Sequence, residues 1–430
     1  MSKTADLLLY SRLPFPEALM NTGTSITAVR PQRRSAIIAV IAASAVFGSA
    51  VQAETVLAAY YRADVMSNTS GGLDTGTAYV DDAGLTFRAE LDALFGGNEA
   101  RLSATLLYNN PTTFSDRYVG DLQVVSNFDA PRGTRIYELW YEEAWSDAYS
   151  LRVGLYDLNS EFDVIDTAGL FINSSHGIGA EYALTGENGP SIFPVTSLTA
   201  RFDWAISESS SLRYALLDAV PGDVNDVGKT SIRLSGDEGA LHALEFNYQL
   251  PGGTRFGVGG WLYSADFELI EGTNVNGDPL RDDGNAGVYG FVDTPLSLGV
   301  EDIDVNAFLR YGIANDDINT LRSYIGGGVV VTGLVGSRPD DQFGLAFASA
   351  RIGDPFERSI IAAGGAVKGS ETSIELTYSA QINDWLRIQP DIQYVINPGA
   401  DASLDDAFVI GLRFHLSASK IYPTEQQSRH

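Results

Sequence analysis

The chain has 430 residues, 19% of them charged, and a formal net charge of −27 at pH 7. So acidic a chain repels nucleic acid, which we exclude as a partner. The absence of cysteine excludes disulfides and thiolate metal sites. No run of about eighteen apolar residues occurs, which excludes a helical membrane protein. The 44 glycines, 20 tyrosines and 20 phenylalanines fit a transmembrane β-barrel, although soluble all-β proteins share this composition.

The N-terminus carries the pattern of a secretory signal. Residues 30–34 include three arginines, an apolar run follows at 36–43, and the small-residue segment 51–53 ends the pattern. The apolar run is too short to remain as a membrane anchor. We therefore expect residues 1–53 to be removed on export, with Met20 as an alternative start that would shorten the long polar lead.

From about residue 81 to residue 416 the chain alternates apolar and polar residues with period two, in segments separated by Gly, Asn, Asp, Pro and Ser clusters. About a dozen or more such strands, with aromatic residues near their ends, favour a closed barrel with a lipid belt over a soluble sandwich. We therefore predict an all-β fold, a transmembrane antiparallel β-barrel over residues 81–416. A periplasmic segment at 54–80 would precede it and a polar tail at 417–430 would follow it.

The clearest strands are 373–382, 386–396 and 407–416, in which apolar and polar residues alternate strictly. We expect their apolar side chains to face lipid and their polar side chains to face the lumen. The polar, glycine-containing stretches 274–285 and 399–406 predict long outer loops, since barrels of this kind have long loops at one end only.

One earlier strand, 135–143, offers two faces for the lumen. Glu138, Trp140 and Glu142 share one face, and Arg135 lies on the other. Two carboxylates in lipid would cost about 2 kcal/mol or more each near the midplane. We therefore expect Glu138 and Trp140 to line the pore. The alternative for Trp140 is an aromatic girdle at the membrane interface.

The same reasoning applies to two further strands. Strand 151–156 directs Arg152 to the lumen, because the residues alternating with it are Leu and Val. Strand 198–204 directs Arg201 and Asp203 to the lumen, because Leu, Ala, Phe and Trp take its other face. These three residues are candidates for the constriction of the pore.

Four segments are distinctive: LRVGLYDLNSEF at 151–162, DTAGLFINSS at 166–175, NGPSIFP at 188–194 and WLRIQPDIQYVINPG at 385–399. They resemble the carbohydrate-selective outer-membrane porins of the OprB family, and the resemblance covers the chain from about residue 70 to residue 416. It implies a sixteen-stranded antiparallel barrel. It also implies a lumen narrowed by inward-folded loops and lined with polar and aromatic groups that bind sugars weakly.

Four polar residues fall within the first two of these segments: Asp157, Asn159, Glu161 and Asn173. Two interpretations stand side by side. The residues line the pore as part of a loop, or they brace that loop, because Asn and Asp are also favoured in turns for conformational reasons.

The resemblance implies an outer-membrane protein that passes small carbohydrates, such as monosaccharides and polyols, into the periplasm by passive diffusion. A selective pore of this kind needs weak contacts at several points, so that solute leaves as well as enters. The alternative is a general or ion-selective porin, favoured if the acidic surplus lies inside the pore. The expected partners are small sugars, outer-membrane lipid, the barrel-assembly machinery and further copies of the chain.

Enzyme and cofactor sites are not expected. The sequence Gly228-Lys229-Thr230 resembles the end of a phosphate loop, but the preceding glycine, Gly222, is one residue too far away. The four histidines do not have metal-ligand spacing. We therefore predict neither catalytic residues nor a cofactor nor a metal.

Overall fold

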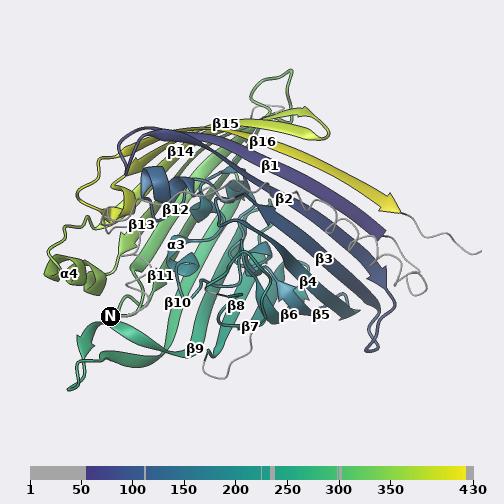
Figure 1. The fold of residues 1–430 in the computed structure, drawn as a ribbon. Helices are drawn as coiled ribbons and strands as arrows, with labels where there is room; N and C mark the ends of the chain where they lie inside the picture. Colours follow the sequence, from purple (N-terminus) through teal and green to yellow (C-terminus); the bar gives the residue numbers. More distant parts are fainter. Residues whose placement is uncertain are drawn as a thin grey trace, which may run out of the picture.

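The computed structural model describes residues 55–110, 113–223, 225–232, 238–297, 299 and 303–422. The signal predicted at residues 1–53 lies outside this part of the chain. Within it, each strand pairs antiparallel with its neighbours in sequence, and the first strand pairs with the last, so that the sheet closes into a barrel (Figure 1). Closure leaves no strand edge with unpaired backbone N–H and C=O groups, as a sheet that crosses lipid requires. The predicted antiparallel β-barrel is confirmed.

The described residues contain sixteen strands. They are β1 (Thr55–Ser70), β2 (Gly76–Leu91), β3 (Glu99–Asn109), β4 (Gly133–Ser146), β5 (Tyr149–Tyr156), β6 (Ser197–Ser207), β7 (Ser210–Asp218), β8 (Ala240–Gln249), β9 (Arg255–Thr273), β10 (Pro279–Pro295), β11 (Asp304–Ala314), β12 (Leu321–Thr332), β13 (Gln342–Ile352), β14 (Ser370–Asn383), β15 (Leu386–Ile396) and β16 (Ala407–Tyr422). None of the helices in the described ranges is long and apolar enough to cross a membrane.

The barrel wall is longer at both ends of the chain than predicted. Residues 55–80, expected as part of a periplasmic segment, form β1 and the start of β2, and β1 closes the barrel against β16. That prediction was wrong, because backbone pairing with the last strand places β1 in the wall although its outward face is rich in small residues. Strand β16 also takes in residues 417–422 of the predicted tail, and residues 423–430 lie outside the described chain.

The two ends of the barrel differ. Turns such as 147–148, 208–209 and 384–385 are very short, whereas the other end carries the long loops 110–132 and 157–196. This asymmetry is typical of outer-membrane barrels, whose short turns face the periplasm. Both Thr55 and Tyr422 lie at the short-turn end.

The predicted outer loops are partly confirmed. Residues 397–406 form a loop that includes the 3₁₀ turn η5 (Pro398–Ala400), as expected for 399–406. In the stretch 274–285 only residues 274–278 form a loop, because the remainder belongs to β10 and pairs with β9. The predicted faces of strand 373–382 are confirmed: in β14, Ile374 and Leu376 are exposed on the outside of the barrel and Glu375 is buried inside.

Two loops fold into the barrel and pack against its inner wall. Loop 110–132 contains the π-turn η1 (Ser115–Val119) and forms an apolar cluster with β1, β2, β15 and β16. Loop 157–196 contains η2 (Leu158–Ser160), η3 (Thr167–Leu170), η4 (Ser174–His176) and α3 (Ala180–Ala183). A further helix, α4 (Asp354–Ala362), lies in loop 353–369.

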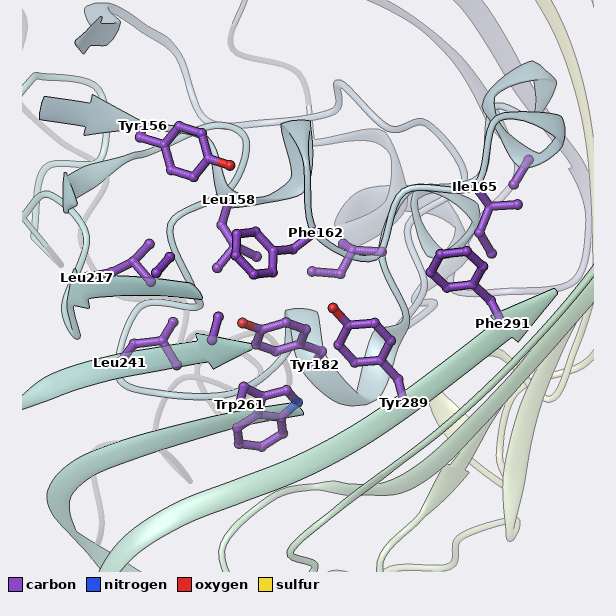
Figure 2. Packing of buried hydrophobic residues seen from close by; sticks show 14 of the residues in the cluster. Tyr156, Leu158, Phe162, Ile165, Tyr182, Leu217, Leu241, Trp261, Tyr289 and Phe291 are labelled. Atoms are coloured by element: carbon purple, nitrogen blue, oxygen red, sulfur yellow. The ribbon is translucent and has the colours of Figure 1, made fainter. Parts of the chain in front are cut away.

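The apolar side chains of loop 157–196 meet the inner wall along β7 to β13. Figure 2 shows Leu158 and Phe162 of the loop near Leu217 of the wall, and Tyr182 lying over Trp261. The rings of Tyr182 and Trp261 stack with centroids 5.2 Å apart. The aromatic groups inside this half of the barrel therefore hold the loop, and their faces are not open to solute.

Candidate functional site: the pore and its constriction

Strand β4 carries a β-bulge that changes which residues face inward. The pairing with β3 steps from Thr105 and Glu138 to Leu106 and Ile136, so that Tyr137 is an extra residue. Arg135 is buried inside the barrel, where it donates to the Pro194 carbonyl at 3.0 Å. The expectation that Arg135 faces lipid was wrong, because the extra residue reverses the alternation, so that Arg135 before the bulge and Glu138 after it both face inward.

The structure brings Arg152 and Arg201 together at the root of loop 157–196. Arg201 donates to Glu161 of the loop at 2.8 and 2.9 Å and to Glu142 of β4 at 3.0 Å. Arg152 donates to Glu142 at 2.9 Å. Arg201 is only 2% exposed. The two arginines therefore tie the loop to the wall in a packed ionic network.

Trp140 lies beneath this network. The guanidinium carbon of Arg152 sits 3.9 Å from the centroid of the indole ring, and the indole Nε1 donates to Glu138 at 3.3 Å. The side chain is 8% exposed and belongs to the inner apolar cluster. A cation–π contact of this kind occupies the ring face that a sugar would need.

Asp157 and Asn159 stabilise the first turn of the loop by hydrogen bonds. Asp157 accepts a hydrogen bond from the Tyr137 hydroxyl at 2.6 Å and caps η2 by accepting from the Asn159 backbone N–H at 2.9 Å. Asn159 in turn donates to the carbonyls of Phe162 and Gly177. Both side chains are engaged in bracing contacts within the loop.

Asp203 of β6 is linked to the loop through Arg213, and Asn173 of the loop is linked to the wall through Gln393. Arg213 links Asp203, at 2.7 Å, to the backbone carbonyl of Glu161, at 2.8 Å. Asn173 caps η4 by accepting from the Ser175 N–H at 3.0 Å and donates to Gln393 of β15 at 3.2 Å.

Charged residues of β14 that were not predicted as site residues from the sequence also bind the two inward-folded loops. Glu375 accepts the backbone N–H groups of Ile172 and Asn173 at 2.6 and 3.0 Å. Glu371, four residues earlier on the same face of β14, accepts those of Leu122 and Gln123 in loop 110–132 at 2.7 and 3.0 Å. The position of Glu375 on the polar face of the predicted strand 373–382 was visible in the sequence, whereas Glu371 lies before that strand, and the loop partners of both residues were not predicted.

Arg310 of β11 makes a further buried connection to the loop. It forms salt bridges with Asp163 at 2.7 Å and Glu181 at 2.8 Å, and both carboxylates belong to loop 157–196. All three side chains are almost completely buried. On β8, Glu245 accepts the Asp163 backbone N–H at 2.7 Å. The loop is therefore fastened to several strands around the barrel.

The open part of the lumen is a cavity of about 1020 Å³ between loop 157–196 and the periplasmic halves of the strands. Four arginines, six side-chain amides and three aspartates lie among its lining groups: Arg62, Arg255, Arg387, Arg413, Asn127, Gln249, Asn306, Gln342, Gln381, Gln389, Asp166, Asp293 and Asp384. None of the nine predicted pore residues lines it within the described chain. Asp203 lines a smaller cavity of about 240 Å³.

The family model of the carbohydrate-selective porins, OprB family, matches residues 74–417. The chain belongs to the OprB family. It is 22% identical over 395 residues to Porin B of Pseudomonas aeruginosa, covering 82% of this chain and 85% of that one. Its fold is similar to a structure of Pseudomonas putida OprB at high pH, with a TM-score of 0.72, 17% identity and coverage of 85% and 94%. Its fold is also similar to that of the outer-membrane channel DcaP of Acinetobacter baumannii, with a TM-score of 0.53 and 10% identity, covering 85% of this chain and 98% of that one.

Membership of the OprB family makes this chain an outer-membrane channel of the carbohydrate-selective class and not an enzyme. The sixteen strands implied by the resemblance are confirmed by the barrel. Sugars are the substrates that this family membership implies.

The arginines of the cavity in this OprB-family porin differ in how far they are neutralised. Arg62 is paired with Asp82 at 2.6 Å, and Arg413 with Asp64 at 2.8 Å. Arg387 instead donates to the neutral side chain of Gln381 at 2.7 Å. Among the described residues no carboxylate lies within 4.0 Å of it. It also donates to the neutral side chains of Gln342 at 3.4 Å and Ser379 at 3.5 Å, so its positive charge, unlike that of the other three cavity arginines, has no carboxylate partner among the described residues.

One feature of the sequence indicated that the cavity-lining groups of β15 face the lumen. Arg387 and Gln389 lie on the polar face of the predicted strand 386–396, within the signature segment 385–399. That pattern identifies them as luminal. It does not show that loop 157–196 covers Arg152 and Arg201 and contacts Gln389 through the Leu170 carbonyl, while it leaves Arg387 open to the cavity.

Proposed function

We propose that this porin passes monosaccharides and related polyols into the periplasm by passive diffusion, and that solute contacts the 1020 Å³ cavity. Arg387 and its amide neighbours Gln342 and Gln381 supply the contacts to hydroxyl groups. Arg152, Arg201 and the other predicted residues position the loop that narrows the path. We also propose outer-membrane lipid, the barrel-assembly machinery and further copies of the chain as partners.

The observation that carries this proposal is the chemistry of the cavity lining. Amides and guanidinium groups offer donors and acceptors spaced around an open volume, which matches the many hydroxyl groups of a sugar. Each such contact is exchanged with water, so that it remains weak enough for solute to leave.

The alternative, a general or ion-selective porin, depends on where the carboxylates are. Many acidic residues do lie inside the barrel. However, Asp64, Asp82, Glu142 and Asp163 are paired with arginines, and Glu375 accepts backbone N–H groups. Carboxylates neutralised in this way give little attraction for cations. These paired carboxylates therefore support a loop-bracing role over cation selection, and the three aspartates that line the cavity, Asp166, Asp293 and Asp384, share it with four arginines.

Planar-bilayer conductance, titrated with glucose, xylose, maltose and mannitol, tests the proposal. We expect sugar to reduce the ion current and Arg387→Ala to weaken that block about tenfold, because one hydrogen bond to a charged group contributes about 1.5 kcal/mol. The same variant should shift ion preference toward cations, since it removes a fixed positive charge.

Arg358→Ala is the matched control, because Arg358 lies on α4 outside the cavity and pairs with Glu271 at the surface. It should leave the sugar block unchanged. If sugars fail to reduce the current through the unmutated protein at any concentration up to solubility, the carbohydrate proposal is lost and the general-porin alternative replaces it.

A further inference from the structure

The turn between β2 and β3 folds back over the outer surface of the barrel. Residues 92–98 form this turn at the periplasmic end. Glu142 of β4 faces inward, where it binds Arg201, so its neighbours Tyr141 and Glu143 face outward. Glu143 is nevertheless only 1% exposed. The turn therefore covers a carboxylate on the lipid-facing side of the wall.

Glu143 accepts hydrogen bonds from the backbone N–H groups of the turn. Its carboxylate accepts the N–H groups of Leu94 at 3.0 Å, Phe95 at 3.1 Å and Gly97 at 2.6 Å. The Tyr141 hydroxyl also donates to Glu143 and accepts from the Leu94 N–H at 3.1 Å. Because unpaired backbone groups are costly in lipid, this arrangement lets an irregular turn enter an apolar environment.

The side chains at the tip of the turn are apolar and uncovered. Leu94 is 70% exposed and Phe95 is 74% exposed. The Phe95 ring makes an edge contact with Tyr141, with centroids 6.3 Å apart. The exposed apolar surface is therefore continuous with the outer face of β4, which meets lipid.

The depth of the turn follows from the aromatic residues around it. Trp145, Tyr149, Trp204 and Tyr248 are exposed near the periplasmic ends of β4 to β8 and mark the membrane interface. Tyr141 precedes Trp145 by four residues, which is roughly 13 Å along a strand and about 10 Å in depth at the usual tilt. The turn, packed against Tyr141, lies on the lipid side of this aromatic row.

We propose that the turn at residues 92–98 inserts Leu94 and Phe95 among the acyl chains of the inner, phospholipid leaflet and so anchors this side of the barrel. The partner is the phospholipid leaflet, and no protein partner is needed. The polar residues at the base of the turn remain at the interface, where Asn98 donates to the Trp145 carbonyl at 2.9 Å.

The absence of native cysteine allows single-site labelling. The cysteine introduced by Phe95→Cys is labelled with a nitroxide, and the labelled protein is reconstituted in phospholipid vesicles. Accessibility to oxygen, which concentrates in lipid, is compared with accessibility to a water-soluble nickel chelate. Leu244→Cys on the exposed outer face of β8 is the lipid reference, and Asp147→Cys in the exposed turn 147–148 is the aqueous reference.

We expect the oxygen-to-nickel ratio at position 95 to match that at position 244 and to exceed that at position 147 several-fold. A ratio equal to that at position 147 overturns the proposal, and so does a label shielded from both reagents, which would indicate contact with protein.

Glu143→Ala in the Phe95→Cys background provides a second test. Loss of the carboxylate releases three backbone donors, so the turn should leave the lipid and the ratio should fall toward the aqueous value. An unchanged lipid ratio contradicts the role given to Glu143. If this variant fails to assemble, the Phe95→Cys measurement decides the proposal by itself.

Discussion

Replacing Arg310 with alanine should loosen the loop that narrows the pore. Arg310 binds Asp163 and Glu181, which lie far apart along loop 157–196, and all three side chains are buried. Breaking a buried pair by removing one partner costs about 3–5 kcal/mol, because the remaining charge is left uncompensated. Here one substitution leaves two carboxylates without their cation.

The expected magnitude follows from this cost. A factor of ten corresponds to about 1.4 kcal/mol, so the ratio of displaced to seated loop should rise roughly 100- to 4,000-fold. Glu375 and Glu245 still hold neighbouring segments of the loop. We therefore expect local displacement around Asp163 and Glu181 and an intact barrel.

Single-channel conductance and maltose permeation measure the change. Both should increase in Arg310→Ala relative to the unmutated protein, and the loop should become sensitive to protease. Arg310→Lys retains the charge without the fork of donors and should give an intermediate result. Combining Arg310→Met with Asp163→Asn and Glu181→Gln removes the unpaired charges and should restore much of the closed state.

Arg322→Ala is the matched control, because Arg322 forms a solvent-exposed pair with Asp354 that contributes about 0–1 kcal/mol. Conductance and protease resistance should be unchanged in it. If Arg310→Ala likewise shows the conductance, permeation and protease resistance of the unmutated protein, the reasoning that this ionic contact fixes the constriction is refuted.

Three further predictions concern assembly, pH and processing. Ile410→Arg, on the outer face of β16, should destabilise the assembled barrel by about 2–4 kcal/mol, whereas Gln381→Arg in the hydrated cavity should have little effect, as measured by urea unfolding in lipid vesicles. Burial, together with the neighbouring Glu138 carboxylate, raises the pKa of Asp157 to about 7. Its contribution to stability is therefore present at low pH and is lost as the pH rises from about 4 to 7. Asp157→Asn should flatten this dependence in calorimetric unfolding, and an unchanged pH profile would contradict the assignment. The N-terminal sequence of envelope-extracted protein should begin at Glu54. An N-terminus at Met1 or Met20 would contradict the predicted cleavage of an export signal.

The alternation of residues by itself determined which side chains face lipid in the regular strands. Ile410 and Arg413 of β16 lie outside and inside the barrel as the sequence predicted. This works because successive side chains of a strand point to opposite faces and because lipid accepts only apolar ones. The rule failed at Arg135, where one extra residue in β4 reverses the alternation. It also missed β1, whose place in the wall depends on pairing with β16.

Only the tertiary structure decided which inward-facing residues remain in contact with water. Arg152, Arg201 and Arg387 all face inward and have the same chemistry. Loop 157–196 covers the first two and leaves Arg387 open to the cavity. The path of that loop is fixed by contacts such as that between Glu375 and Ile172, which are separated by 203 residues in the sequence. Local patterning reports the face of a strand, whereas solvent access inside a barrel depends on such distant contacts.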